Sequence, residues 1–199
     1  MELAAAIEAR RMVRAFTAEP VDPTVVDRLC DLARRAPSAG NSQGLDLVVL
    51  EGPEQVRAYW DVTLPEARRA GFRWPGLIAA PVLVLVVTDP EAYVARYAEA
   101  DKAATGLGEG ADAWAVPYWW VDAGAAVEHL LLGAVDAGLG ACLFGPFDHE
   151  PAVAAAFAIP AGRRLVASIA LGHPAPDAPG RSAQRPRRPL AEVVHRGGW

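Results

Sequence analysis

The stretch Pro81-Val-Leu-Val-Leu-Val-Val87 decides the fold, because it is apolar at every position. Alternating apolar residues indicate a strand with one covered face, whereas a continuous apolar run is typical of a strand covered on both faces. We therefore predict a central strand over 81–87 in a sheet that has helices on both sides. The uncharged run from Leu77 to Thr88 is too short to span a bilayer, which needs roughly 18 or more residues.

Helix and strand patterns alternate on both sides of this central strand. Asp22-Pro23 is a strong helix start, since aspartate caps the first amide groups and proline fits the first turn. In the long helix, Asp122, His129 and Asp136 recur every seven residues and predict a polar stripe. This order predicts an α/β or α+β protein. The patterns indicate helices over 1–11, 22–36, 53–70, 90–104, 119–137 and 151–157, and strands over 47–50, 81–87, 141–144 and 165–171.

Length and composition limit the class of protein. The 199 residues fit one domain, and 52% hydrophobic against 22% charged residues is the composition of a soluble globular protein. The net charge of −5 argues against nucleic acid as a partner. Cys30 and Cys142 match no disulfide framework or zinc spacing and are expected to be buried thiols. The N-terminal residues have no secretory pattern, so we expect a cytoplasmic protein that is not in a membrane.

Common catalytic motifs are missing from the sequence. It has no GxSxG elbow, no phosphate-binding GxxxxGK[ST] loop and no HExxH, and its four histidines are scattered, so no metal site is predicted. Gly106-Leu-Gly-Glu-Gly110 has a dinucleotide-like look, but no strand precedes it. The glycine-rich region 105–117 is better interpreted as a lid or surface loop.

The arginines are unevenly placed for an acidic protein. They cluster near both ends of the chain, at Arg10, Arg11 and Arg14 and at Arg185, Arg187 and Arg188. Compensation of a helix dipole explains the first cluster and a solvated tail over 174–189 explains the second. Alternatively, guanidinium groups from both ends converge on a phosphate. Similarly, the loop 37–43 has two interpretations. It is either a plain turn or a loop whose carboxamides bind the edge of a flat heteroaromatic ring.

Five blocks together resemble the nitroreductase family of FMN-dependent oxidoreductases. They cover nearly the whole chain in the family's order: Arg10-Arg-Met-Val-Arg-Ala-Phe16, Glu19-Pro-Val-Asp22, Ala36-Pro-Ser-Ala-Gly-Asn-Ser-Gln43, Gly138-Leu-Gly-Ala-Cys-Leu-Phe-Gly145 and Arg187-Arg-Pro-Leu-Ala-Glu-Val-Val194. The resemblance implies one α+β domain over 1–199, a three-layer α-β-α sandwich with a central mixed, mostly antiparallel sheet. It also implies an obligate homodimer with two FMN sites at the interface.

The same resemblance implies which residues bind FMN. Arg10 and Arg14 match basic residues at the flavin phosphate and pyrimidine edge, with Arg11 and Met12 beside them. The loop that approaches the flavin from the other subunit matches Pro37, Ser38, Ala39, Asn41 and Gln43. Backbone near flavin N5 matches Phe144 and Gly145, and the cationic phosphate ligands of the tail match Arg185 and Arg187.

The implied chemistry is ping-pong hydride transfer from NAD(P)H to an acceptor. Since the flavin carries the redox chemistry, no catalytic side chain is expected. Flat aromatic acceptors such as quinones or nitroarenes would stack on aromatic side chains near the site, although packing explains these side chains equally well. The aromatic residues concerned are Trp74, Trp114, Tyr118, Trp119 and Trp120.

Two departures from the family leave other functions open. Met12 stands where the family usually has a serine that touches the phosphate, and Gly44 replaces the usual proline after Gln43. The chain could therefore be a flavin-modifying or flavin-storing relative, or a degenerate non-catalytic binding protein on the same fold. In the last case Met12→Ser is expected to raise FMN affinity.

Overall fold

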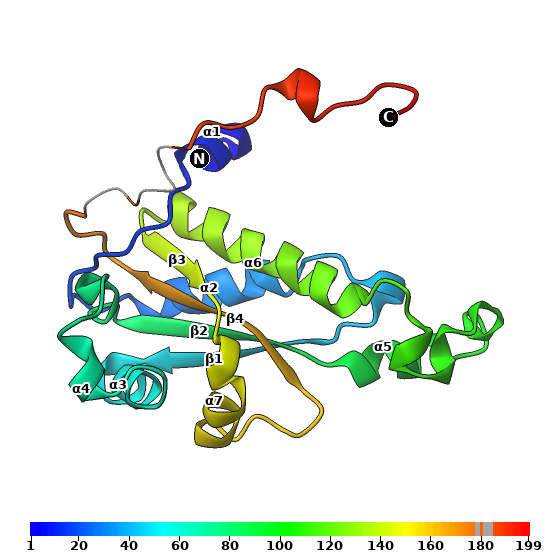
Figure 1. Ribbon diagram of the computed structural model, residues 1–199, viewed down its shortest axis with the longest axis horizontal. Helices are drawn as coiled ribbons and strands as arrows, with labels where there is room; N and C mark the ends of the chain where they lie inside the picture. Colours follow the sequence, from blue (N-terminus) through cyan, green and yellow to red (C-terminus); the bar gives the residue numbers. More distant parts are fainter. Residues whose placement is uncertain (178–179, 181–184) are drawn as a thin grey trace.

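The apolar run forms strand β2 (Val82–Thr88), and each of its residues is buried. In this computed structural model, which describes residues 1–177, 180 and 185–199, β2 pairs with β1 (Leu45–Glu51) on one side and β4 (Arg164–Gly172) on the other. Strand β3 (Gly140–Phe144) pairs with β4 and completes the order β1-β2-β4-β3 (Figure 1). The predicted central strand is confirmed.

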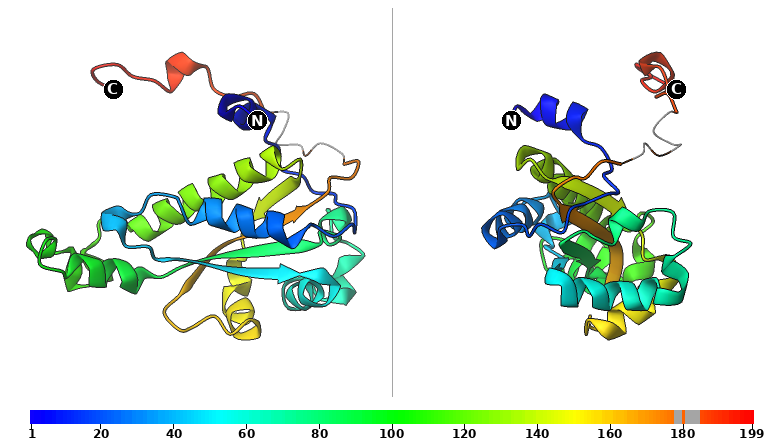
Figure 2. Two further views of the ribbon diagram at one scale, coloured as in Figure 1. Left: turned by 180° about the vertical axis from the view of Figure 1, so that it is seen from behind. Right: turned by 90° about the vertical axis from the view of Figure 1, so that its left-hand side faces the viewer.

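Helical layers cover both faces of the sheet, as the continuous apolar pattern predicts (Figure 2). Val82, Val84 and Val86 belong to a core shared with α2 and α6, whereas their neighbours at 83, 85 and 87 belong to a core shared with α3 and α7. The α+β class is therefore confirmed. The ladders between described strands are antiparallel, and an isolated bridge between Met12 and Ala141 is parallel.

The helices mostly follow the predicted order, with two differences. The single helix expected over 53–70 is wrong, because the residue before Pro65 is excluded from helical backbone angles and Leu64 has φ −143°. The helix expected over 90–104 ends early, and short 3-10 turns follow it. The α-helices are α1 (Leu3–Ala9), α2 (Pro23–Ala33), α3 (Gly52–Thr63), α4 (Glu66–Arg69), α5 (Pro90–Tyr97), α6 (Tyr118–Asp136) and α7 (Glu150–Ala156).

Helix α2 begins where the Asp22-Pro23 signal predicts. The Asp22 side chain accepts the backbone N–H and the hydroxyl of Thr24, both at 2.8 Å. These bonds lower the pKa of Asp22. A local capping signal is sufficient here because its donor and acceptor lie two residues apart.

Helix α1 and the C-terminal segment extend from the same side of the body (Figures 1 and 2). Leu3 and Ile7 of α1 are 66% and 51% exposed, whereas Ala6 is buried. Leu190, Val193 and Trp199 of the C-terminal segment are also exposed. Part of the predicted tail, residues 178–179 and 181–184, lies outside the described residues.

The polar residues of α6 do not form a simple solvated stripe. His129 Nδ1 lies 3.0 Å from the Leu32 carbonyl oxygen of α2, and Asp136 binds the N-terminal amino group. Asp122 is half-buried and bonds to a loop and to α5. None of the described helices combines the length and the apolarity needed to cross a membrane.

Candidate functional site

Two segments that lie far apart in the sequence, 12–14 and 141–145, meet at one cavity of about 330 Å³. The bridge between Met12 and Ala141, and the hydrogen bond from Val13 N–H to the Ala141 carbonyl at 2.9 Å, place the segment after α1 alongside β3. As a result Arg14 lines the same cavity as Phe144 and Gly145. These are three of the residues for which the family resemblance implies FMN contacts.

The Arg14 guanidinium is held in a defined orientation. Its carbon lies 5.0 Å from the centre of the Trp74 ring, and Nη1 donates to the Met12 carbonyl at 3.1 Å. The Arg14 backbone N–H donates to Asp177 Oδ2 at 3.1 Å. A guanidinium stacked in this way keeps donors free for an anionic group.

Aromatic side chains from α3 and from the segment after α4 form the wall of this cavity. Trp60 stacks on Phe144 with 5.6 Å between ring centres, and Tyr59 meets Phe144 edge-on at 6.2 Å. Phe72 also lines the cavity and lies 6.1 Å from Trp60. Tyr59, Trp60 and Phe72 were not predicted from the sequence. The adjacent aromatics at 59 and 60 were the available signal, but in a helix they indicate packing equally well.

A turn after β3 leaves little room beside Gly145. Phe147 has φ +45° and is 82% exposed. A Cβ on Gly145 would lie 2.9 Å from Phe147 Cζ, so a larger residue would displace this ring. The glycine therefore allows the Phe147 ring to pack closely against the backbone at 145.

Met12, Arg10 and Arg11 do not line this cavity among its described residues. Met12 points inward, packs against both cores and accepts the Leu143 N–H at its sulfur, at 3.4 Å. Arg11 donates to the Glu8 carbonyl at the end of α1, which is the dipole compensation considered for it. Arg10 pairs with Glu128 at 3.6 Å, and Arg185 and Arg187 are exposed on the C-terminal segment.

The predicted loop lies at a second cavity of about 460 Å³, whose lining includes Pro37, Ser38, Asn41 and Gln43. The two cavities share none of their described lining residues. The cavity beside the loop is lined by Tyr93 of α5, whereas the Arg14 cavity is lined by Phe72 and Trp74 of the segment after α4. Helices α4 and α5 lie at opposite ends of the molecule (Figure 1). A single chain therefore does not bring the loop to Arg14.

The loop is a built structure rather than a plain turn. Gly40, Asn41 and Gln43 have φ of +62°, +55° and +52°. The Gln43 N–H donates to Ser38 Oγ at 3.1 Å, and the Ser42 hydroxyl donates to the Ala39 carbonyl at 2.6 Å. Such left-handed angles in residues other than glycine persist only where the surroundings hold them.

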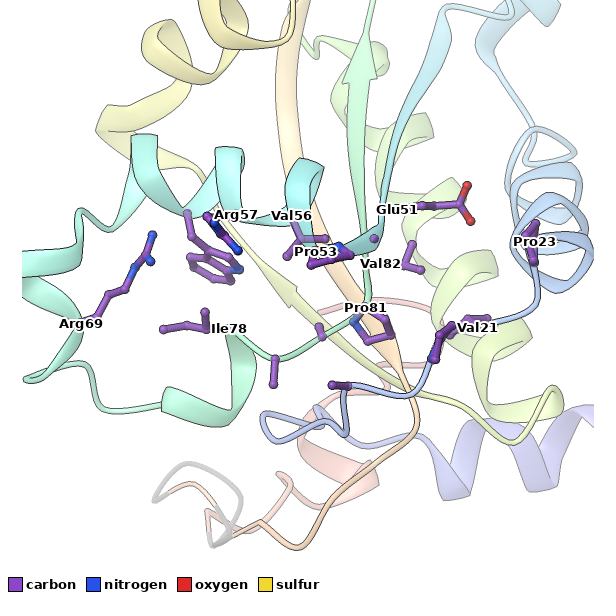
Figure 3. Close-up of a pocket in the computed structure, with 16 residues that line it drawn as sticks. Val21, Pro23, Glu51, Pro53, Val56, Arg57, Arg69, Ile78, Pro81 and Val82 are labelled. Atoms are coloured by element: carbon purple, nitrogen blue, oxygen red, sulfur yellow. The ribbon is translucent and has the colours of Figure 1, made fainter.

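A third cavity, of about 620 Å³, is lined by none of the residues that were predicted to bind the cofactor. Its walls are mainly apolar, and Figure 3 shows Arg57 and Arg69 near one end and Glu51 toward the other. Trp60 borders both this cavity and the one beside Arg14. Its Nε1 is buried and has no hydrogen-bond partner among the described residues.

The aromatic residues at 114–120 mainly pack. Trp114 and Trp119 are buried in a cluster with Tyr93, and Trp114 Nε1 donates to the Leu107 carbonyl at 2.9 Å. Of the five aromatics considered for substrate stacking, Trp74 alone is among the described lining residues of the Arg14 cavity. The packing interpretation therefore holds for Trp114 and Trp119.

The cysteines are not activated thiols. Burial raises the pKa of Cys30 to about 11 and also raises the pKa of Cys142. The histidine, cysteine and acidic side chains of the described residues form no group of three that could hold a metal ion.

Comparisons with known proteins agree with one another. The model of the "Nitroreductase family" matches residues 7–173. The chain is 29% identical over 203 residues to a Thermus thermophilus protein named NADH dehydrogenase, covering 93% of this chain and 91% of that one. It is 29% identical over 216 residues to a Nocardioides 4-nitrobenzoate reductase, covering 96% and 87%. A Desulfovibrio desulfuricans nitroreductase solved in complex with FMN superposes with a TM-score of 0.69 at 28% identity, covering 98% and 95%.

Proposed function

The chain belongs to the nitroreductase family, and we propose that it is an FMN-dependent oxidoreductase that transfers hydride from NAD(P)H to an aromatic or conjugated acceptor by a ping-pong mechanism. The observation that carries this proposal is the cavity that Arg14 shares with Phe144 and Gly145. A related structure holds FMN, and relatives are named for NADH oxidation and nitrobenzoate reduction.

The side chains at this cavity fit a flavin nucleotide. Arg14 offers a stacked guanidinium for a phosphate or for the anionic edge of a flat ring. Trp60, Phe72 and Phe144 offer apolar surface that excludes water from a reacting ring. FMN, when bound, would supply the hydride chemistry, so the protein needs to bind, orient and shield the cofactor and needs no acid–base dyad.

A second copy of the chain completes the site in this proposal. The loop 37–43 and the Arg14 cavity lie at opposite ends of one chain, so they can meet only if the loop comes from a partner. The carboxamides of Asn41 and Gln43 would then face the edge of the flavin. The exposed Arg185 and Arg187 would reach the phosphate. The homodimer, the single domain over 1–199 and the cytoplasmic location are parts of this proposal.

Nitroarenes and quinones are the acceptors that we propose. Trp74 lines the Arg14 cavity, and a flat conjugated molecule can stack on an aromatic face. The flavin-storing and non-catalytic alternatives predict no turnover of such acceptors.

Spectroscopy and one matched pair of variants test the proposal. Purified protein incubated with FMN is expected to retain about one flavin per chain and to oxidise NADH or NADPH when a nitroarene or quinone is added. Arg14→Gln should weaken FMN binding about 10- to 100-fold, the effect of losing a charged hydrogen bond. Arg73→Gln is the control, because Arg73 also lies over Trp74, at 4.7 Å, but is not among the described lining residues.

Each alternative has its own signature. A spectrum without flavin after reconstitution would contradict the proposal and favour a non-catalytic binding protein. A flavin-containing protein that oxidises neither nicotinamide with these acceptors would favour the flavin-storing relative.

A further inference from the structure

Asp122 lies under the loop 37–43 and joins it to two helices. Its Oδ2 accepts the Ala39 backbone N–H at 2.8 Å and the Tyr93 hydroxyl at 2.9 Å. Asp122 belongs to α6, Tyr93 to α5 and Ala39 to the loop, so one half-buried carboxylate connects three segments that are far apart in sequence. It also lines the cavity beside the loop.

Tyr93 is a permanent donor to this carboxylate. Its side chain is buried, and burial, with the hydrogen bond and the charge of Asp122, raises the pKa of the phenol. The hydroxyl therefore keeps its proton over the physiological range and points its O–H at Asp122. Asp122 Oδ2 thus accepts two hydrogen bonds, one from a backbone N–H and one from a side-chain hydroxyl.

The other contacts of the loop involve its middle residues and the side chains of α5. Gly40, at φ +62°, lies so close to Tyr97 that a Cβ would be 2.8 Å from the ring. Arg96 Nε donates to the Gly40 carbonyl at 2.9 Å, and its other nitrogens bind Asp101 at 2.7 and 2.8 Å. These contacts hold the middle of the loop, whereas the Asp122 contact holds its beginning.

We propose that Asp122 is the positioning residue of the cofactor loop: its carboxylate fixes the backbone at Ala39 so that the loop is presented in one conformation. Fixing the loop before binding reduces the ordering cost when a ligand arrives. Without the carboxylate, the Ala39 N–H and the Tyr93 hydroxyl lose their shared partner. The role in FMN binding rests on the proposed function, but the fixing of the loop does not.

Hydrogen exchange of the loop amides tests the fixing directly. In Asp122→Ala, the amides of residues 39–43 are expected to exchange at least tenfold faster, with little change in β2 and β4. Asp122→Asn keeps an acceptor oxygen for the Ala39 N–H and should restore most of the protection. Tyr93→Phe keeps the Ala39 bond and should change exchange less than Asp122→Ala does. Asp136→Ala is the control, because it removes a carboxylate from the other end of α6.

FMN titration of the same variants tests the functional role. Asp122→Ala should weaken FMN binding at least tenfold, while the melting temperature of Asp136→Ala and its FMN affinity stay near those of the unmodified protein. Unchanged loop exchange in Asp122→Ala, or faster exchange spread evenly over the sheet, would overturn the proposal. If the unmodified protein binds no FMN, the proposed function fails, and the exchange experiment alone decides whether Asp122 fixes the loop. If Asp122→Ala does not fold, Asp122→Leu takes its place in both experiments, because leucine fills the space of the carboxylate and likewise accepts no hydrogen bond from the Ala39 N–H.

Discussion

Met12 is a packing residue that is not among the described lining residues of the Arg14 cavity. It contacts both cores, and its sulfur accepts the Leu143 N–H. A serine at this position would place its hydroxyl in apolar surroundings rather than against a phosphate. A serine at position 12 is therefore expected to lower the stability of the fold rather than to raise FMN affinity.

We predict that Met12→Ser lowers the free energy of unfolding by about 1–3 kcal/mol, because a partly buried large side chain is truncated. Met12→Leu keeps the volume and should cost less than about 1.5 kcal/mol. Urea denaturation of both variants checks this. A Met12→Ser variant as stable as the unmodified protein, with higher FMN affinity, would show that position 12 faces the cofactor.

At the scale of elements, one carboxylate connects α7 to β4. Glu150, the first residue of α7, accepts Arg164 Nε at 2.8 Å, Arg164 Nη2 at 3.2 Å and the Leu165 N–H at 3.0 Å. The Arg164 guanidinium holds the pKa of Glu150 below its usual value of 4.5. A carboxylate with a lowered pKa stabilises the folded state above the unfolded pKa, and this contribution disappears as the pH falls through the folded value.

We predict that Glu150→Gln lowers the free energy of unfolding by about 1 kcal/mol at pH 7, the usual size of a partly exposed charged hydrogen bond. The difference from the unmodified protein should persist down to about pH 4.5 and disappear below it. Denaturant titrations from pH 7 to pH 3 measure this, with Asp148→Asn as an exposed neighbouring control. A difference that does not depend on pH would show that the ion pair is not its source.

At the scale of the molecule, the proposed site is shared between two chains. In the proposed dimer, one chain contributes Arg14 and the other contributes the loop 37–43. This arrangement has a consequence for mixed dimers, since a two-fold dimer contains two equivalent sites. If one chain carries a substitution at Arg14 and its partner carries one at Asp122, both substitutions affect the same site. The other site then has an intact Arg14 and an intact loop.

We predict that a heterodimer of an Arg14→Gln chain and an Asp122→Ala chain binds about one FMN per two chains, because Arg14 of the second chain meets the intact loop of the first. Each homodimer should bind FMN weakly. Co-expression with two different tags, tandem purification and the visible spectrum measure this. Weak binding by the heterodimer, equal to that of the homodimers, would mean that the loop and Arg14 do not serve one shared site.

The family and the fold class could be predicted because the signals are local and numerous. Every residue of the run at 82–87 is apolar, so both faces of the strand are apolar, and the Asp22 cap acts over two residues. The five sequence blocks then pointed to the family whose model matches residues 7–173. Of the candidate site, the nearness of Arg14 to Phe144 and Gly145 followed from the family's pattern rather than from any periodicity in the chain.

The sequence by itself determined the buried strand, the two helical layers and the start of α2, because each depends on residues that are neighbours in the chain. The tertiary structure alone decided that Tyr59 and Trp60 form the wall of a cavity while Trp114 packs in a core, since all three are aromatic residues with equal tendencies to be buried. It alone decided that Asp122 holds Ala39, which lies 83 positions away. Contacts between residues so far apart in the sequence depend on how the helices pack on the sheet, and no sequence spacing predicts that packing.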